Sequence, residues 1–197
     1  DNMKILLASR NVGKIKEFQE IFSNTGIEII SLLDVDDNSE VNEKGNTFLE
    51  NAYLKAKFYY DKYHMAVLAD DSGLVIEALK GKPGVKSARF SGKNSTSLKN
   101  NLKLLKKMKK KQNRNARFIC VLCFISQDGV VHYFNGTLDG QIAYEMKGEN
   151  GFGYDPLFYI PAFEMTLAEM SFDQKTYLSH RYDACEKLIK FLQKEGH

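Results

Sequence analysis

Short apolar runs alternate with segments of helical periodicity along the first half of the chain. The apolar runs predict strands at Lys4–Ala8, Ile27–Ile30 and Met65–Ala69. Between them, apolar residues three or four positions apart predict helices at Ile15–Phe22 and Thr47–Tyr63. This order of strands and helices is typical of an α/β domain.

The second half adds adjacent strands. Phe118–Ile125 and Val130–Asn135 predict a β-hairpin, because a Gln-Asp-Gly turn lies between them. Helical spacing predicts helices at Leu98–Met108 and Ser179–Gln193, and glycines make Gly148–Pro156 a loop. Together the two halves indicate an α/β fold with a mixed sheet and flanking helices.

Length and composition favour one packed domain over residues 1–197. The chain has 197 residues, of which 43% are hydrophobic, enough to build a core. No apolar run approaches the ~20 residues of a membrane-spanning helix. The stretch Met3–Ala8 is too short for a signal peptide, so we expect a cytoplasmic protein that does not bind membranes.

The three cysteines are expected to be core thiols. Cys120 and Cys123 form a CxxC pair, a spacing that can bind zinc or carry redox chemistry. However, the pair lies in an apolar run without a second CxxC or a histidine cluster. With Cys185, they fit a reducing compartment better than a disulfide framework.

Charge is unevenly distributed. Between Glu77 and Asp128 there are 14 of the 28 basic residues and no acidic residue. This region could bind nucleic acid. A solvated surface is the favoured interpretation, because no aromatic residue interrupts the cations from Ser91 to Arg117.

The motif Ser9-Arg10-Asn11-Val12-Gly13-Lys14 joins a predicted strand to a predicted helix. Backbone N–H groups at a helix N-terminus attract anions, and these side chains would complete a phosphate cradle. The motif lacks the P-loop pattern, and Asn11 could instead be an ordinary helix cap.

Two carboxylates, Asp70 and Asp71, follow the predicted strand Met65–Ala69. Ligand sites of open α/β sheets lie beyond the carboxyl ends of strands, and adjacent carboxylates suit Mg²⁺. Because neighbouring strand residues point to opposite faces, we expect one aspartate to face the site and the other to support the loop. A simple Asp-Ser-Gly turn is the alternative.

The acidic segment before Thr47 could supply a second metal carboxylate from Glu40 or Glu43. Thr47 and Glu50 match a capping box at the start of the next helix, where Lys55 follows. A solvated loop before a capped helix is the alternative.

Two later segments could bind a planar base. Gly148–Pro156 contains three glycines and two aromatics, and aromatic rings stack on bases. Lys175 and the triplet Ser179-His180-Arg181 could donate hydrogen bonds to a keto oxygen, a pattern that would reject an amino group. Ser179 could equally cap a helix, and His180 could lie at the surface.

Taken together, these segments resemble the inosine triphosphate pyrophosphatase (ITPase) family, which hydrolyses non-standard purine nucleoside triphosphates. The matching motifs occur in family order over nearly the whole chain: SRNVGK at Ser9–Lys14, EKGNTFLENA at Glu43–Ala52, ADDSGL at Ala69–Leu74, PGVKSARF at Pro83–Phe90, GFGYDPLF at Gly151–Phe158 and SHR at Ser179–Arg181.

The resemblance implies an elongated mixed sheet with two lobes and a central cleft. It also implies a homodimeric, Mg²⁺-dependent nucleoside-triphosphate diphosphatase, in which Mn²⁺ could replace Mg²⁺. The expected substrates are ITP, dITP and XTP, which would be cleaved to the monophosphate and pyrophosphate.

The resemblance also assigns roles. Asp71, Lys14 and Lys55 would be catalytic, and Glu43 and Asp71 would bind the metal, with Glu40 as an alternative to Glu43. The expected substrate contacts are Ser9, Arg10, Asn11, Val12, Gly13, Lys14, Lys55, Ser72, Phe152, Gly153, Tyr154, Asp155, Lys175, His180 and Arg181. Phe152 or Tyr154 would stack on the base.

Two positions depart from the family pattern. Arg10 and Tyr182 stand where the family often has small residues. Arg10 could add a phosphate contact or face solvent, and Tyr182 could change the packing behind His180.

Three other functions are distinguishable by experiment. A nucleotide sensor would bind ITP without releasing pyrophosphate, and an RNA-binding module would show steep salt dependence. A pyrophosphatase for modified pyrimidine nucleotides would differ in substrate choice.

Overall fold

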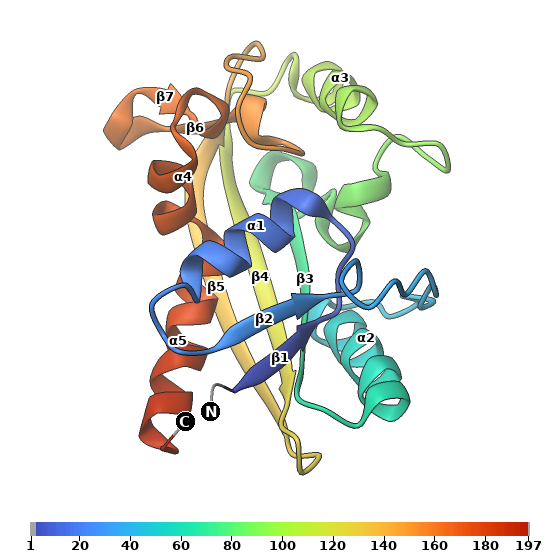
Figure 1. Ribbon diagram of the computed structural model, residues 1–197. Coiled ribbons are helices and arrows are strands. Elements are labelled where there is room, and N and C mark those ends of the chain that lie inside the picture. The colour runs from blue at the N-terminus through green and yellow to red at the C-terminus, as the bar shows by residue number, and fades with distance from the viewer. Residues whose placement is uncertain (1–2, 197) are drawn as a thin grey trace. The chain divides into compact units, whose positions relative to one another are not determined.

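The computed structural model describes residues 3–196, and its strands form one seven-stranded sheet in the order β2-β1-β3-β4-β5-β6-β7 (Figure 1). The strands are β1 (Lys4–Leu7), β2 (Glu28–Ser31), β3 (Val67–Ile76), β4 (Asn115–Ile125), β5 (Val131–Ile142), β6 (Phe158–Ile160) and β7 (Met165–Thr166). The helices are α1 (Val12–Ile21), α2 (Phe48–Tyr63), α3 (Ser97–Met108), α4 (Phe172–Leu178) and α5 (His180–Lys194).

The sheet is mixed, as predicted. β1 pairs in parallel with β2 and β3, whereas β6 pairs antiparallel with β5 and β7. A tight turn joins β4 to β5, with the Ser126 N–H donating to the Val130 carbonyl at 2.9 Å. The predicted hairpin is therefore confirmed, although both strands extend beyond the predicted segments.

The chain divides into two compact units. The first comprises the residues up to Asp71, Cys120–Gly136 and the segment from His180 onward. The second comprises Ser72–Ile119 and Thr137–Ser179. The single two-lobed domain with a central cleft stays a prediction.

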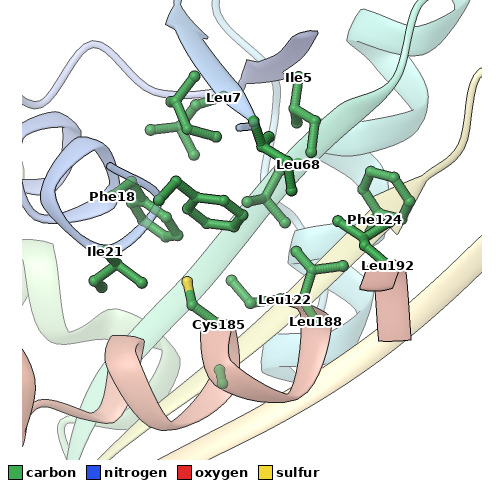
Figure 2. Packing of buried hydrophobic residues seen from close by; sticks show 14 of the residues in the cluster. Ile5, Leu7, Phe18, Ile21, Leu68, Leu122, Phe124, Cys185, Leu188 and Leu192 are labelled. Carbon is green, nitrogen blue, oxygen red and sulfur yellow. The ribbon is translucent and has the colours of Figure 1, made fainter. Parts of the chain in front are cut away.

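A continuous apolar core holds the first unit together. Figure 2 shows Ile5 and Leu7 of β1, Phe18 of α1, and Leu188 of α5 within this cluster. Their positions follow from side-chain periodicity: alternate residues of a strand share one face, and residues three or four apart share one side of a helix. Burial of this cluster fixes α1 and therefore the turn that precedes it.

The second unit has a core of its own. Leu74 and Ile76 of β3 pack in one buried cluster with Leu104 of α3 and Phe158 of β6. Phe158 also lies against Phe118 of β4, with ring centroids 4.4 Å apart. α3 is therefore anchored through its buried side chains, while its lysines remain outside.

β3 is longer than predicted. The sequence predicts that the strand ends at Ala69, but it continues through Asp70-Asp71-Ser72-Gly73 to Ile76. The Asp-Ser-Gly turn is therefore wrong. β1 pairs with β3 only near Leu68, so the aspartates lie on β3 just beyond the end of β1.

The three cysteines are free thiols in the core, as predicted. Burial raises the pKa of Cys123 to about 12, against the effect of a hydrogen bond with Tyr133, and burial also raises the pKa of Cys185. Among residues 3–196, no helix has the length and apolar character that a bilayer-spanning segment needs.

Candidate active site

The turn after β1 places the first predicted motif at the N-terminus of α1. Asn11 is the N-cap residue, and its Oδ1 accepts a hydrogen bond from the Lys14 N–H at 3.0 Å. Ser9 Oγ accepts a bond from the Asn11 N–H at 3.1 Å. Val12 and Gly13 form the first helical turn. The cap interpretation of Asn11 is confirmed, and the helix end is a place where anions are favoured.

Arg10 has a structural contact that its sequence position did not indicate. Its guanidinium donates to the Ser39 carbonyl at 2.7 Å and to the Asp37 carbonyl at 3.4 Å. The carboxylate of Asp37 is buried and accepts a hydrogen bond from Lys62 on α2 at 2.7 Å. These contacts tie the acidic loop to both the β1 turn and α2.

The start of α2 fixes the end of the acidic loop. Thr47 is the N-cap, as predicted, and accepts a hydrogen bond from the Glu50 N–H at 3.1 Å. Asn51 Oδ1 accepts a bond from the Gly45 N–H at 2.8 Å. A Cβ at Gly45 would lie 2.7 Å from the Glu50 Cβ and 2.8 Å from Asn51 Oδ1, so only glycine fits there. This local packing positions Glu43, two residues earlier.

Lys55 of α2 connects the acidic loop with β3. Its Nζ lies 3.3 Å from Glu43 Oε1 and donates a hydrogen bond to the backbone carbonyl of Asp70. Burial is the largest influence on the pKa of Lys55 and lowers it, but the charges of Asp70 and Glu43 outweigh burial and leave the pKa raised. Lys55 therefore stays charged beside the carboxylates.

Asp70 lies within a buried cluster of charges. Its Oδ1 is 3.3 Å from Lys14 Nζ, and its Oδ2 is 3.7 Å from Arg181 Nε. Arg181 also pairs with Glu17 of α1, with an NH1–Oε1 distance of 3.1 Å. Removing a partner from such a buried cluster would leave an uncompensated charge, so these four residues depend on one another. Asp70 is therefore the aspartate of the pair that supports the surrounding structure.

Asp71 has a different environment. Its side-chain Oδ2 is buried and has no hydrogen-bond partner among residues 3–196. Burial raises the pKa of Asp71 to about 6, and the charges of Asp70 and Glu43 also act to raise it, while Lys55 opposes them. A buried carboxylate oxygen without a hydrogen bond is costly, so this oxygen is suited to contact a bound cation or water.

The charged form of Lys14 is disfavoured by its surroundings. Burial is the main cause of its lowered pKa, and the charges of Arg181 and Lys55 add to the effect, while Asp70 opposes it. An anion with several charges, such as a phosphate chain, would relieve the repulsion between these cations.

Several residues of the β1 turn, the acidic loop and α2 line a cavity in the first unit with a volume of about 380 Å³. Glu40 and Glu43 both contribute to its wall, so the two candidate acidic-loop carboxylates both reach it. The residues that line the cavity are Ala8, Ser9, Arg10, Asn11, Leu32, Ser39, Glu40, Val41, Glu43, Lys55 and Tyr59.

The side chains present fit a divalent cation of the Mg²⁺ type. Within residues 3–196, no three His, Cys, Asp or Glu residues gather as a complete metal cage. Mg²⁺ does not require one, because one or two carboxylates with substrate phosphates and waters usually suffice. Two carboxylates meet that requirement. Asp71 has a buried oxygen without a hydrogen-bond partner among residues 3–196, and Glu43 lies close enough for its charge to raise the pKa of Asp71.

The loop predicted to bind a base belongs to the second unit. Asp155 Oδ2 accepts a hydrogen bond from the Phe152 N–H at 2.9 Å and pairs with Lys175 Nζ at 3.0 Å. Lys175 Nζ also lies 4.2 Å from the centre of the Phe152 ring. Gly151 has a positive φ of 75°, and a Cβ there would lie 2.2 Å from Asp155 Oδ2. The chain thus folds tightly around the Asp155 carboxylate.

Tyr154 is an anchor of this loop. It is buried in the core of the second unit, and its hydroxyl donates to the Ser87 carbonyl at 2.6 Å. Burial raises the pKa of Tyr154. Phe152 is only partly buried, so of the two aromatic residues it is the better candidate for stacking.

The remaining predicted residues are divided between the units. Ser72 lies on β3 directly after Asp71, and Ser179 lies between α4 and α5 with its hydroxyl donating to the Thr176 carbonyl at 2.9 Å. His180 and Arg181 begin α5 and are both buried, so a surface position for His180 is wrong.

The sequence did not indicate the surroundings of Arg181. The base-pocket role assigned to it places a keto oxygen near its guanidinium, whereas its described partners are the carboxylates of Glu17 and Asp70. The only available signal was an acidic residue, Glu17, between apolar positions of a predicted amphipathic helix. The lysines from Lys106 to Lys111 are exposed, in keeping with the solvated surface expected there.

The chain belongs to the Ham1 family, which it matches over residues 5–191. The resemblance indicated by the sequence motifs is therefore confirmed, and solved structures of this family confirm the α/β fold. A Ham1 protein from Staphylococcus aureus has a TM-score of 0.86 and 42% identity, covering 98% of this chain and 99% of that chain. A HAM1 protein from Coxiella burnetii has a TM-score of 0.88 and 37% identity, with the same coverage.

Among sequence relatives, a dITP/XTP pyrophosphatase from an Exiguobacterium species is 47% identical over 186 residues. The match covers 94% of this chain and 95% of that protein. The similarity thus extends over almost the whole of the chain described above.

Proposed function

We propose that this protein is a Mg²⁺-dependent nucleoside-triphosphate pyrophosphatase that hydrolyses non-standard purine nucleotides. Its substrates would be dITP, XTP and ITP, and its products the nucleoside monophosphate and pyrophosphate. The dITP/XTP pyrophosphatase of the Exiguobacterium species, at 47% identity over almost the full chain, supports this choice of substrates.

One observation carries the chemical part of the proposal. A buried carboxylate oxygen of Asp71 has no hydrogen-bond partner among residues 3–196, and it lies in the same charged environment as Lys55 and Glu43. A site with one carboxylate oxygen that accepts no hydrogen bond from the described residues, a second acid and two lysines suits a phosphate chain that carries a divalent cation.

In the proposed reaction, Ser9, Asn11, Lys14 and Lys55 bind the triphosphate. Asp71 orients a water molecule and accepts its proton as the water oxygen bonds to the α-phosphorus. The bond from the α-phosphorus to the bridging oxygen breaks, and its electron pair leaves with pyrophosphate. Lys14 and Lys55 stabilise the negative charge that accumulates on this leaving group.

Mg²⁺, held by Asp71 and Glu43, would supply charge neutralisation for the phosphate oxygens. Glu43 is the stronger candidate for the second ligand than Glu40, because its charge acts on Asp71 and it pairs with Lys55. Mn²⁺ would serve as a substitute.

The base would be bound by the loop of the second unit. Phe152 would stack on the purine, as aromatic residues do on bases generally. Lys175 would contribute a hydrogen-bond donor that favours a keto oxygen over an amino group. Gly153, Tyr154, Asp155 and His180 remain the other proposed contacts or supports.

We further propose that the protein is a cytoplasmic homodimer. Three buried free thiols support a reducing compartment. Analytical ultracentrifugation at several protein concentrations tests the dimer, and a single monomer-sized species would contradict it.

A pyrophosphate-release assay tests the proposed activity. The panel contains dITP, XTP, ITP, dATP, dGTP and a modified pyrimidine triphosphate, each with Mg²⁺ and with EDTA. We expect rapid release from the first three nucleotides, only with metal. Binding of ITP without release of pyrophosphate would indicate a nucleotide sensor. Faster release from the modified pyrimidine triphosphate would indicate that modified pyrimidine nucleotides are the substrates.

A matched pair of variants connects this activity with the site. Asp71→Asn should abolish most pyrophosphate release. Asp61→Asn changes an exposed acid on α2 that pairs with Lys57 and should leave the rate unchanged. Equal loss in both variants would contradict the role of Asp71.

A further inference from the structure

We propose that Asn101 on α3 is a positioning residue for the base-binding loop and thereby influences base selectivity. The inference rests on the proposed function, because it gives that loop its ligand, a keto-purine base. Asn101 belongs to none of the motifs that carry the family resemblance, and it lies on a helix otherwise notable for its exposed lysines.

The contact that carries the inference joins α3 to the loop within the second unit. Asn101 is 3% exposed, and its side-chain Nδ2 donates a hydrogen bond to the Gly153 carbonyl at 3.0 Å. Gly153 follows Phe152, the proposed stacking residue. The Asn101 amide therefore holds the backbone one residue from the ring that would contact the base.

Gly153 needs such an anchor because it has no side chain to fix it. Its φ is +61°, and a Cβ placed there would meet nothing within 4 Å. A glycine in open space is the point at which a loop bends most easily. On the far side, the chain is fixed by Tyr154 at the Ser87 carbonyl and by Asp155 with Lys175. The Asn101 hydrogen bond fixes the peptide that precedes these attachments.

The amide oxygen of Asn101 makes no hydrogen bond with the described residues. Its Oδ1 is buried and has no hydrogen-bond partner within residues 3–196. Leaving a buried acceptor unpaired costs stability, and each such group in a native protein calls for an explanation. A role in holding the Gly153 carbonyl explains why the amide is placed here although only its Nδ2 makes a hydrogen bond within residues 3–196.

The neighbouring Asn100 shows what a purely structural asparagine looks like on the same helix. Its Oδ1 accepts a hydrogen bond from the Ser91 N–H at 2.8 Å, and its Nδ2 donates to the Ala88 carbonyl at 3.1 Å. Both ends of that amide are satisfied. Asn100 thus joins two segments of the chain through both polar atoms of its amide, whereas Asn101 holds only the Gly153 carbonyl.

The test compares Asn101→Leu, which is similar in size and has no polar atoms, with Asn101→Ala and a control. Leu102→Ala is the control, because Leu102 is 51% exposed on the same helix. Three quantities are measured for each full-length protein: kcat and KM for dITP and dATP, the inhibition constant of inorganic triphosphate, and Tm.

We expect Asn101→Leu to raise the KM for dITP by roughly 5-fold, the effect of one neutral hydrogen bond, with little change in kcat. The preference for dITP over dATP should fall by a similar factor. Inorganic triphosphate, which has no base, should inhibit all variants equally. The Tm of Asn101→Leu should stay close to that of the parent, because loss of the unpaired acceptor offsets loss of the hydrogen bond to the half-buried Gly153 carbonyl.

Two results would overturn the inference. Unchanged KM and selectivity in both Asn101 variants would show that the loop does not depend on this contact. A lowered Tm with equal losses for dITP and inorganic triphosphate would show a structural role only. If the unsubstituted protein itself releases no pyrophosphate from dITP, the proposed function fails instead, and the assay separates these cases.

Discussion

The substitution Asp71→Asn should make the protein more stable while it destroys activity. Asp71 is 8% exposed, and burial raises its pKa from 3.8 to about 6. Keeping this carboxyl group ionised at neutral pH therefore lowers the stability of the folded protein. Asparagine has nearly the same shape and carries no charge, so it removes that cost.

The size of the effect follows from the pKa. A rise from 3.8 to about 6 corresponds to roughly 3 kcal/mol of lost stability when the group is ionised. The asparagine amide would itself be incompletely hydrogen-bonded, which costs about 1–2 kcal/mol. We therefore expect a net gain in the free energy of unfolding of about 1–2 kcal/mol near neutral pH.

The sign of the pH dependence is also defined. Because the folded pKa of Asp71 is raised, the folded state binds more protons than the unfolded state between about pH 4 and pH 6. The contribution of Asp71 to the free energy of unfolding of the parent protein therefore falls as the pH rises through that interval. The asparagine of the variant does not titrate, so the difference in free energy of unfolding between the two proteins should increase from about pH 4 to pH 6.

Urea denaturation in EDTA, at several pH values, measures this difference. Adding Mg²⁺ should then stabilise the parent protein and leave Asp71→Asn nearly unchanged, because a bound cation stabilises only the folded state that holds it. In parallel, pyrophosphate release should fall at least ~100-fold. Equal stability of the two proteins at neutral pH would refute the reasoning about burial.

Three further predictions concern the surroundings of the site. Gly45→Ala should place a Cβ 2.7 Å from that of Glu50 and displace the acidic loop; we expect a loss of about 1–3 kcal/mol in urea and weaker activation by Mg²⁺ in titrations. A normal Mg²⁺ titration would argue against this coupling. Arg181→Met should remove the cation that pairs with Glu17 and that acts on Asp70 together with Lys14, and lower the free energy of unfolding by about 3–5 kcal/mol; a change below about 1 kcal/mol would show that the charge cluster is dispensable. The hydrogen bond from Lys62 lowers the pKa of Asp37, so its stabilising contribution is present above about pH 4 and lost as the pH falls further. The protection of residues 33–46 against hydrogen exchange, relative to the intrinsic exchange rate at each pH, should fall on acidification in the parent protein and fall less in Asp37→Asn; identical protection profiles would contradict this role.

Periodicity predicted much of the first unit. The helix beginning after Thr47 and the hairpin between β4 and β5 follow from local rules of capping and alternation. The gathering of Ser9–Lys14 with the aspartates follows from a general property of parallel strands, whose carboxyl ends meet at one edge. These features depend on local sequence or on topology alone.

The errors have a common physical origin in long-range pairing. Asp70 and Asp71 look like a turn because isolated aspartates disfavour strands. In the folded protein, Lys14 and Arg181 compensate Asp70, so the strand continues. Arg181 is 164 positions from Glu17, and no local pattern reports a contact over that separation.

The loop of the second unit shows the same limit. The sequence indicates aromatic and glycine residues there but not which ring is buried. Tyr154 packs in a core built from several strands, and Phe152 does not belong to that core. The sequence did not indicate a role for Asn101, because that role depends on a backbone carbonyl 52 positions away in the chain.

The placement of the thiols gives the protein a built-in reporter. Cys120, Cys123 and Cys185 all belong to the first unit and are buried, and the chain has no other cysteine. A thiol-specific alkylating reagent can therefore react only when this part of the molecule opens. The rate of labelling in native buffer measures that opening without a signal from the second unit, and nucleotide or metal that binds the first unit should slow it.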